Sequence, residues 1–390
     1  MMKEAVIVSA VRTPIGRCRG TLASVPAHRL GARVVEEAVR RAGIVPESID
    51  DVIFANLMNN EINNMGRMVA LEAGLPISVP GITLDRQCAA SLNALAYGAI
   101  QIMAGFAATV VVGGVESDSR RPWSLEKTET AYSVQPPRFV DIHTSPDRLG
   151  NPSMGMTAEN IARRYALSRE ELDAFALRSH RLASAAWQEG RFDGQLAPIS
   201  LPARKGQDII VRNDESVRPD CSLAALSSLR PCFCDDGVVT AGNSSPMSDG
   251  AGALVLMERS LAEQQGLETL AVFRGYAVAG VDPNFMGLGP VPATAKLLKQ
   301  TGLTVSDIDL WELNEAFAAQ SLACIRDIGM DAQRVNPNGG AIALGHPLAG
   351  SGAILATKAV YDMQRRHLKN AVITFCVGGG QGVAVLLTRE

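Results

Sequence analysis

The amino-acid sequence predicts an α/β fold that occurs twice within one chain of 390 residues. The segment GIVPESID at 43–50 returns without a gap as GLTVSDID at 302–309, 259 positions later, and a short apolar run follows each copy. A second pair of similar segments is GALVL at 252–256 and GVAVL at 382–386. A period this long is not that of a solenoid. We therefore expect two similar halves, with a site where they meet.

Strand-like runs rich in β-branched residues alternate with longer helical patterns in both halves. This alternation is typical of βαβ units around a mostly parallel sheet. The strands expected in the first half cover residues 4–9, 51–55, 81–84 and 109–112. Those expected in the second half cover residues 271–276, 309–313, 371–377 and 383–388.

The alternation stops between residues 117 and 247. This stretch has proline breaks and many charges, and we expect amphipathic helices only near 157–165 and 169–189. A plain linker is disfavoured, because these helices have apolar faces. From Asp249 the run DGAG resumes the strand that closes the first half. The expected parts are an N-terminal half at 1–116 completed by 248–269, an inserted loop domain at 117–247, and a C-terminal half at 270–390.

Two helices are expected at the centre of the molecule. The run CAASLNALAYGAIQIMAGF from Cys88 is apolar on nearly every side, and PLAGSGAILATKAVYDM from Pro347 is small and apolar in its first turns. A helix that is apolar all round is buried, and small residues at its start let other backbone come close. The repeat brings Cys88 to within one residue of His346. We expect these two residues to begin equivalent helices whose N-termini face a common cavity.

Composition excludes several classes of function. The net charge of −3, without a long run of one sign, argues against nucleic acid or an acidic membrane surface as a general partner. Seven scattered cysteines indicate reduced thiols and a cytoplasmic location. Cys232 and Cys234 are two apart, but no further ligand stands at metal-binding spacing, so no metal site is expected. No apolar run has the length of a membrane span, and the N-terminal run is too short for a signal peptide.

Four residues at the ends of predicted elements could carry chemistry. Cys88 is placed at a helix N-terminus, where the helix dipole would lower the pKa of its thiol from about 8.5 toward neutrality. Asn314 follows an expected strand, and His346 lies in a glycine-rich turn. By position alone, Cys88 could equally be a small buried apolar residue, and Asn314 could be a helix cap.

Cys376 closes an expected strand and precedes the run GGGQG at 378–382. Three glycines in a row leave backbone N–H groups free to bind an anion. A dinucleotide-binding fingerprint is excluded, because that fingerprint opens a helix and a strand follows here.

Several sequence blocks, taken together, resemble the thiolase family. The blocks occur in the family's order and span nearly the whole chain: RTPIGR, RQCAASLNA, MGMTAEN, TAGNSSPMSDGAGA, NEAFA, NPNGGAIALGHP and CVGGGQG. The resemblance implies a duplicated fold of two βαβ halves, with mixed, mostly parallel sheets packed as α-β-α-β-α layers, plus the inserted loop domain. It also implies a homodimer or a homotetramer.

The resemblance further implies an acyl-CoA C-acyltransferase. Such an enzyme catalyses the reversible CoA-dependent cleavage of 3-ketoacyl-CoA and the Claisen condensation of acetyl-CoA through an S-acyl-cysteine. Cys88 would be the nucleophile, His346 would accept its proton, and Cys376 would move the proton on the α-carbon. His346 and a water held by Asn314 would stabilise the enolate, and the N–H groups of Cys88 and Gly378 would stabilise the acyl-enzyme oxyanion.

Coenzyme A is then a substrate, and no permanently bound cofactor is expected. The positions that match the family's CoA contacts are Arg218, Phe233 and Ser245, and Phe317 would line the acyl pocket. Ser153 stands where biosynthetic relatives usually have histidine, which leaves acyl-chain length and the physiological direction open.

Two alternatives to a thiolase remain. A decarboxylating 3-ketoacyl synthase would use one cysteine with two histidines, or with histidine and asparagine, and would not need Cys376. A non-catalytic CoA- or lipid-binding relative is disfavoured, because Cys88, Asn314, His346 and Cys376 are all present.

Overall fold

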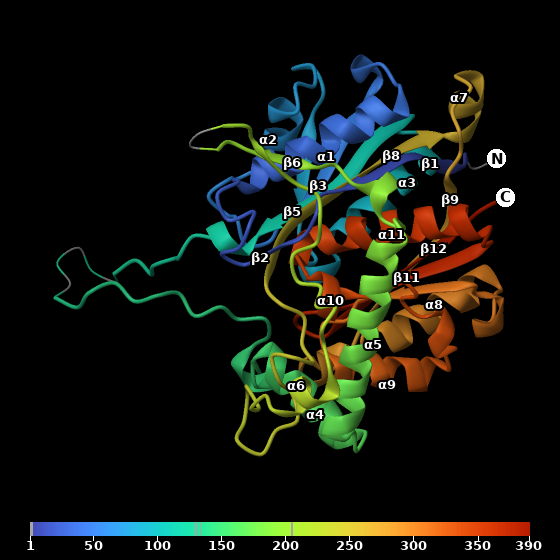
Figure 1. Ribbon diagram of the computed structural model, residues 1–390. Helices are drawn as coiled ribbons and strands as arrows, with labels where there is room; N and C mark the ends of the chain where they lie inside the picture. Colours follow the sequence, from blue (N-terminus) through green and yellow to red (C-terminus); the bar gives the residue numbers. More distant parts are fainter. Residues whose placement is uncertain (1–2, 129, 131, 133, 204–205) are drawn as a thin grey trace.

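The computed structural model describes residues 3–390 except 129, 131, 133, 204 and 205 (Figure 1). Its strands lie in the order β10-β11-β12-β9-β1-β8-β5-β3-β4. On either side of the contact between β1 and β9, the order β9-β12-β11-β10 corresponds to β1-β8-β5-β3, and β4 is an additional strand beyond β3. At this contact only Val6 pairs with Val272 and Ile7 with Ala271. Each side of that contact is one half of the predicted duplication.

The first half consists of six strands and four helices in the described residues. The strands are β1 (Ala5–Arg12), β2 (Gly16–Arg17), β3 (Asp51–Ala55), β4 (Gly81–Leu84), β5 (Thr109–Ser117) and β8 (Ser248–Glu258). The helices are α1 (Ala27–Ala42), α2 (Met65–Glu72), α3 (Ala90–Ala104) and α7 (Arg259–Gln264). α1 packs against β1, β5 and β8, and α2 packs against α1, so both cover the outer face of this sheet.

The second half repeats this plan. Its strands are β9 (Ala271–Gly280), β10 (Leu310–Leu313), β11 (Asn370–Val377) and β12 (Gln381–Thr388). Its helices are α8 (Pro290–Thr301), α9 (Ala318–Ile328), α10 (Ala341–Leu344) and α11 (Ser351–Arg366). The repeat is visible in detail, because the 3-10 turns η1 (Pro46–Ser48) and η7 (Val305–Asp307) are 259 positions apart.

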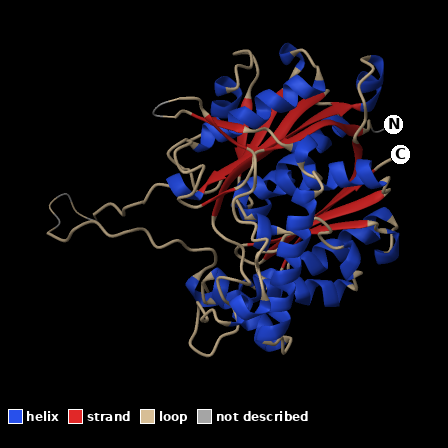
Figure 2. Cartoon of the chain, in the orientation of Figure 1, coloured by secondary structure: helices blue, strands red, loops and turns tan. Residues whose placement is uncertain are grey.

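The central layer holds α3 and α11, which lie between the two sheets (Figure 2). α3 contacts β3, β5 and β8 of its own half and β9 and β12 of the other. α11 contacts β10 and β11 of its own half and β1, β5 and β8 of the other. Apolar residues of both helices belong to one buried cluster. The predicted α-β-α-β-α layering is therefore confirmed.

The sheets are mixed, as predicted, but parallel pairing is confined to the outer strands. β3 pairs in parallel with β4 and β5, and β10 pairs in parallel with β11. β8 is antiparallel to β1 and β5, and β12 is antiparallel to β9 and β11. The reason is local. β12 follows β11 through a short glycine turn, and β8 enters its sheet from the inserted region instead of from a crossover helix.

The predicted elements differ from the observed ones mainly at their ends. The strands expected at 51–55 and 81–84 have the observed bounds of β3 and β4, whereas β1 and β5 run on to Arg12 and Ser117. The helices expected to begin at Cys88 and Pro347 begin at Ala90 and Ser351. The 3-10 turns η2 (Gln87–Ala89) and η9 (Leu348–Gly350) precede them.

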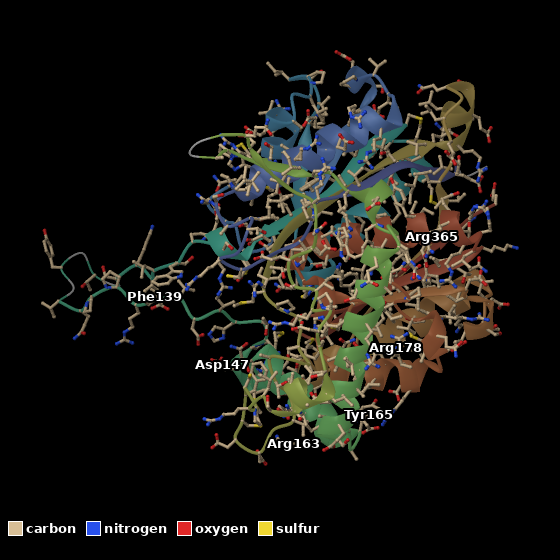
Figure 3. The ribbon with its side chains drawn as sticks, in the orientation of Figure 1. Phe139, Asp147, Arg163, Tyr165, Arg178 and Arg365 are labelled. Carbon is tan, nitrogen blue, oxygen red and sulfur yellow. The ribbon has the colours of Figure 1, made fainter. Side chains whose placement is uncertain are left out.

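Between β5 and β8 the chain leaves the layered core. It forms an arm that projects from the molecule, carrying Phe139, and then the helices α4 (Met154–Arg164), α5 (Arg169–Gln188) and α6 (Leu223–Ser227) (Figure 3). A small hairpin, β6 (Ile199–Leu201) with β7 (Ile209–Val211), lies between α5 and α6. α5 packs on the second half, where Arg178 donates hydrogen bonds to the carbonyl oxygens of Ala332 and Val335. We propose that residues 117–247 form an inserted domain on the duplicated core.

Within the described residues, no helix has the length and apolarity needed to span a membrane. The same residues contain no group of three or more histidine, cysteine, aspartate or glutamate side chains that could hold a metal ion.

Candidate active site

The structure brings the predicted reactive residues together between the two halves. The turn η2, which carries Cys88, packs against β11, which carries Cys376, and against η9, which follows His346. The backbone N–H of Gly378 donates a hydrogen bond to the sulfur of Cys88. The side-chain nitrogen of Asn314 lies 3.4 Å from Nε2 of His346. Both halves therefore contribute functional groups to one site.

The thiol of Cys88 is less acidic than its place in the sequence suggested. Burial raises its pKa to about 11, and the charges of Glu116 and Asp85 act in the same direction. The N–H groups of Gly378 and of Cys88 itself favour the thiolate, but they do not outweigh the loss of water around the sulfur. The prediction of a pKa lowered toward neutrality is wrong for this structure. Near neutral pH the thiol is protonated and needs a base.

His346 can be that base. It lies between α10 and η9, and its backbone N–H donates to Ser248 Oγ at 3.1 Å. Its Nδ1 atom lies 2.6 Å from Ser351 Oγ. Burial lowers the pKa of the imidazole to about 4. The ring is therefore neutral near pH 7 and has one nitrogen free to accept a proton.

Asn314 is fully buried at the end of β10. Its backbone N–H donates to the carbonyl oxygen of Thr374 at 3.0 Å, and its side-chain Oδ1 has no hydrogen-bond partner among the described residues. A buried amide oxygen without a partner marks a place for a water or a substrate group. The helix-cap alternative is excluded, because α9 begins at Ala318 after Phe317, with no side-chain cap.

Cys376 is buried on β11, opposite Gly382 of β12. Burial raises the pKa of its thiol well above the usual value, and the nearby sulfurs of Cys88 and Cys324 add to this effect. The chain then turns at Gly379 and Gly380, whose φ angles of +80° and +84° favour glycine. This turn brings the N–H of Gly378 to Cys88.

A cavity of about 300 Å³ lies where the inserted region meets both halves. Its lining comes from the first half through Arg17, from the inserted region through His180, Arg218 and Ser244, and from the second half through Ile342. His180 accepts a hydrogen bond from the backbone N–H of Arg218 at 3.2 Å. Burial, and then the charge of Arg218, lower the pKa of this histidine to about 4, so near neutral pH the cavity's positive charge comes from its arginines.

The other predicted substrate contacts lie near this cavity or near Cys376. Ser245 follows Ser244 and donates from its hydroxyl to the carbonyl oxygen of Ala316 at 3.1 Å. The rings of Phe233 and Phe317 meet edge to face, with centroids 6.2 Å apart. Phe317 belongs to the same buried apolar cluster as Cys376.

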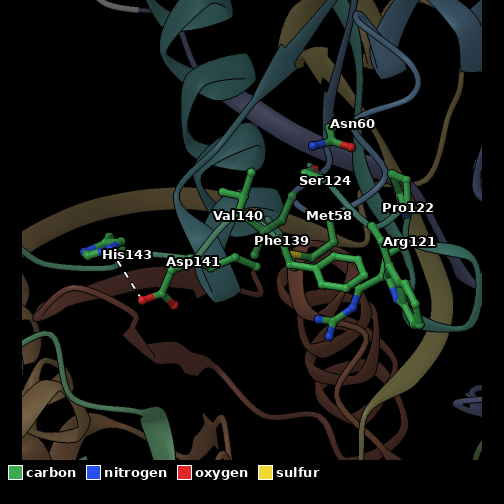
Figure 4. A pocket seen from close by; sticks show the side chains of 12 residues that line it. Met58, Asn60, Arg121, Pro122, Ser124, Phe139, Val140, Asp141 and His143 are labelled. Atoms are coloured by element: carbon green, nitrogen blue, oxygen red, sulfur yellow. Dashed lines mark ion pairs between the residues drawn. The ribbon is translucent and has the colours of Figure 1, made fainter. Parts of the chain in front are cut away.

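A second cavity, of about 620 Å³, lies at the base of the arm (Figure 4). Leu57 and Met58 line it from the first half, and Phe139 and His143 line it from the arm. His143 is half-exposed and lies near Asp141, with 3.7 Å between Nε2 and Oδ2. This position agrees with the interpretation of His143 as a loop residue outside the reactive centre.

Sequence reasoning missed two buried residues next to the site. Glu116 accepts hydrogen bonds from the backbone N–H groups of Met58, at 2.8 Å, and Ala349, at 3.3 Å, and burial raises its pKa to about 7. A carboxylate at the end of an apolar strand was the signal available. Ser351, five positions after His346, carried a weaker signal, because helix starts often contain serine.

Comparison with known proteins identifies two family domains in the chain. Residues 5–260 match the model of the thiolase N-terminal domain, and residues 267–389 match that of the thiolase C-terminal domain. An acetyl-CoA acetyltransferase of Pseudomonas aeruginosa is 43% identical, with each chain covered over 100% of its length. A 3-ketoacyl-CoA thiolase of Bacillus subtilis is 44% identical over 98% of each chain. The crystal structure of the Bacillus anthracis acetyl-CoA acetyltransferase superposes with a TM-score of 0.95, at 40% identity and 99% coverage of both chains.

Proposed function

Because the chain belongs to the thiolase family and is an enzyme of that type, we propose that Cys88, His346 and Cys376 carry out its acyl transfer. The observation that supports these roles best is the convergence of two cysteines on one glycine turn. Cys88 accepts a hydrogen bond from the N–H of Gly378, and Cys376 is the next-to-last residue of β11, the strand that leads into the same turn.

The first half-reaction forms the acyl-enzyme. The sulfur of Cys88 attacks the thioester carbonyl carbon of an acyl-CoA while its proton passes to Nε2 of His346. The oxyanion is held by the N–H groups of Cys88 and Gly378, each of which contributes about 2.7–4 kcal/mol in comparable sites. The bond between the carbonyl carbon and the CoA sulfur then breaks, and the leaving thiolate takes the proton back from His346.

The second half-reaction joins or separates two carbons. In condensation, Cys376 in its thiolate form removes a proton from the α-carbon of acetyl-CoA, and the resulting enolate carbon attacks the acyl group on Cys88. The bond between that acyl carbon and the Cys88 sulfur then breaks, and the Cys88 thiolate takes up the proton that Cys376 now carries. The enolate oxygen lies against His346 and a water held by the unpartnered Oδ1 of Asn314. In cleavage each step runs backwards, and Cys376 donates the proton as an acid. The raised pKa of Cys376 suits the acid role.

Coenzyme A occupies the cavity between the inserted region and the core in this proposal. Arg218 and Arg17 offer positive charge for its phosphates. Ser245 and Phe233, which contact Ala316 and Phe317, would bind it nearer the acyl group. Coenzyme A is then a substrate, and the reaction requires no resident cofactor. The decarboxylating synthase is not supported, because it leaves Cys376 without a role.

We also retain the homodimer or homotetramer and the cytoplasmic location as proposals. Large apolar side chains exposed along the arm, among them Trp123, Tyr132 and Phe139, support self-association. The cysteines are free thiols, which suits a reducing compartment.

The experiment that tests the assigned roles separates the two cysteines. Cys376→Ser should still form an acyl-enzyme with acetyl-CoA but lose about 10²-fold or more in condensation, the usual scale for a positioned acid–base group. Cys88→Ser should form no acyl-enzyme. Intact-protein mass and CoA release measure acylation, and Cys232→Ser, at an exposed cysteine, is the control. Equal loss of acylation in both active-site variants would contradict this division of roles.

A further inference from the structure

Ser351 makes the shorter of the two side-chain hydrogen-bond contacts described for the ring of His346. It is the first residue of α11 and is 1% exposed. Its Oγ atom lies 2.6 Å from Nδ1 of His346, on the opposite side of the ring from the Nε2 atom that faces Asn314. The hydroxyl is therefore placed to control the ring nitrogen that does not touch substrate.

The backbone of the turn is held by other groups. The N–H of His346 donates to Ser248 Oγ, the N–H of Ala349 donates to Glu116, and the N–H of Gly350 donates to the carbonyl oxygen of Pro347 at 2.7 Å. The Ser351 hydroxyl is not needed to build this turn, so its hydrogen bond acts on the orientation and protonation of the ring.

The two half-reactions make opposite demands on His346. To accept the proton of Cys88, Nε2 must be bare, and the neutral ring then carries its proton on Nδ1. To donate to an enolate oxygen, Nε2 must carry a proton. A serine hydroxyl can accept from Nδ1–H and can also donate to a bare Nδ1. A carboxylate at this place could only accept and would favour a single form of the ring.

We propose that Ser351 is a positioning residue that holds the His346 ring in one orientation in both of its protonation forms, so that the same imidazole serves both half-reactions. The inference rests on the proposed roles of Cys88 and His346 and adds a requirement for a group that both donates and accepts at Nδ1.

The equivalent helix supplies a matched control. Ser91 is buried in the first turn of α3, and its Oγ accepts the N–H of Ala353 at 2.9 Å. Ser91 therefore makes one buried hydrogen bond to α11, the helix that begins with Ser351, and makes no hydrogen bond to His346. Ser91→Ala reproduces the structural cost of losing a buried hydroxyl but leaves the ring contact intact.

The test compares Ser351→Ala, Ser351→Thr and Ser91→Ala with the wild type. Stopped-flow CoA release gives the acylation rate, and acetoacetyl-CoA formation gives the condensation rate. We expect Ser351→Ala to lower both by about 10- to 100-fold with little change in KM, because the ring is misplaced while substrate contacts remain. Ser351→Thr keeps the hydroxyl and should recover most of both rates. Ser91→Ala should lose thermal stability and stay close to the wild-type rates.

A second readout is independent of turnover. With ¹⁵N-labelled histidine, the ring nitrogen shifts of His346, assigned from His346→Gln, should change in Ser351→Ala and stay unchanged in Ser91→Ala. Ser351→Ala rates equal to those of Ser91→Ala, a threonine variant as slow as alanine, or unchanged His346 shifts would each overturn the inference. Failure of the proposed roles looks different, because wild-type enzyme would then carry no acetyl group on Cys88 after exposure to acetyl-CoA.

Discussion

At the scale of single residues, the site pairs a thiol and an imidazole that burial keeps uncharged. Desolvation raises the pKa of Cys88 and lowers that of His346. Both shifts favour the neutral pair over thiolate and imidazolium. Charge then develops only as the sulfur attacks, when the N–H groups of Cys88 and Gly378 can stabilise the oxyanion that forms.

The first prediction follows from the protonated thiol. We expect His346→Ala to slow the alkylation of Cys88 by iodoacetamide at about pH 7 by about 10²-fold, the scale of a positioned base. Because the raised pKa is about 11, the fraction of Cys88 that is ionised increases as the pH rises from 7 to about 10. The rates of wild type and variant should therefore converge as the pH rises to about 10. Peptide mass mapping of quenched samples measures both rates.

Exposed Cys232 provides the internal reference, since its labelling should be the same in both proteins. Equal labelling of Cys88 in wild type and variant near pH 7 would show that the thiol ionises without His346. That result would contradict the conclusion that burial raises the pKa of Cys88 and keeps its thiol protonated.

At this scale, the sequence was sufficient to locate the candidate reactive side chains but not to predict the protonation state of Cys88. Cys88, Asn314, His346 and Cys376 lie at or close to the ends of elements, and such positions can be recognised in the sequence. The desolvation of Cys88 depends on what packs over it, and this is set by residues from the other half. Glu116 was missed because its partners, at positions 58 and 349, come together only in the folded chain.

At the scale of elements, the site depends on the close approach of the two central helices. A Cβ atom on Gly352 of α11 would overlap the amide nitrogen of Leu92 in α3. The absence of that atom lets the helix behind Cys88 lie directly against the helix behind His346. This backbone contact therefore helps to set the distance between base and nucleophile.

The second prediction tests this contact. We expect Gly352→Ala to lower the free energy of unfolding by about 1–3 kcal/mol, as overpacking does. We also expect kcat to fall by about 10²-fold, because a shift near 1 Å misaligns the reacting groups. Urea unfolding and steady-state thiolysis of acetoacetyl-CoA measure the two effects.

Gly98→Ala is the matched control. Gly98 also lies in α3, but its added Cβ would meet the side chain of Val112 instead of α11. This variant should lose stability and keep the kcat of the wild type. An equal fall in kcat in both variants would show that any crowding of α3 disturbs the site, and that the α3–α11 contact has no special part.

The positions of most elements could be predicted from the sequence, and their junctions could not. β3 and β4 have the predicted bounds, because short apolar runs between turn residues leave little choice. β5 continues to Ser117, since Gly113 and Gly114 pair with β8, a strand distant in sequence. The 3-10 turn before α3 contains strained backbone, with φ of +48° at Gln87, which apolar periodicity does not reveal.

At the scale of the whole molecule, two similar halves produce one asymmetric site. The strand orders of the two halves correspond on either side of the contact between β1 and β9. The inserted region belongs to the first half in sequence, but its helix α5 packs on the second half. The resulting cavity takes Arg17 from the first half, Arg218 from the inserted region and Ile342 from the second. In the proposed function, the duplicated core supplies the reactive centre, and the inserted region supplies part of the surface that would bind coenzyme A.

The last prediction separates these two contributions. Because Arg218 lines the cavity proposed for coenzyme A, and Cys88, His346 and Cys376 are not part of that lining, Arg218→Ala should raise KM for acetoacetyl-CoA about tenfold or more with little loss of kcat. The acetoacetyl thioester of N-acetylcysteamine lacks the nucleotide and its phosphates, so wild type and variant should cleave it with equal kcat/KM when the accepting thiol is also N-acetylcysteamine. Arg212→Ala, at an exposed arginine of the inserted region that lines a different groove, should change neither substrate's kinetics. A variant that also loses activity toward the short thioester would place Arg218 in the reactive centre, and coenzyme A would then have to bind elsewhere.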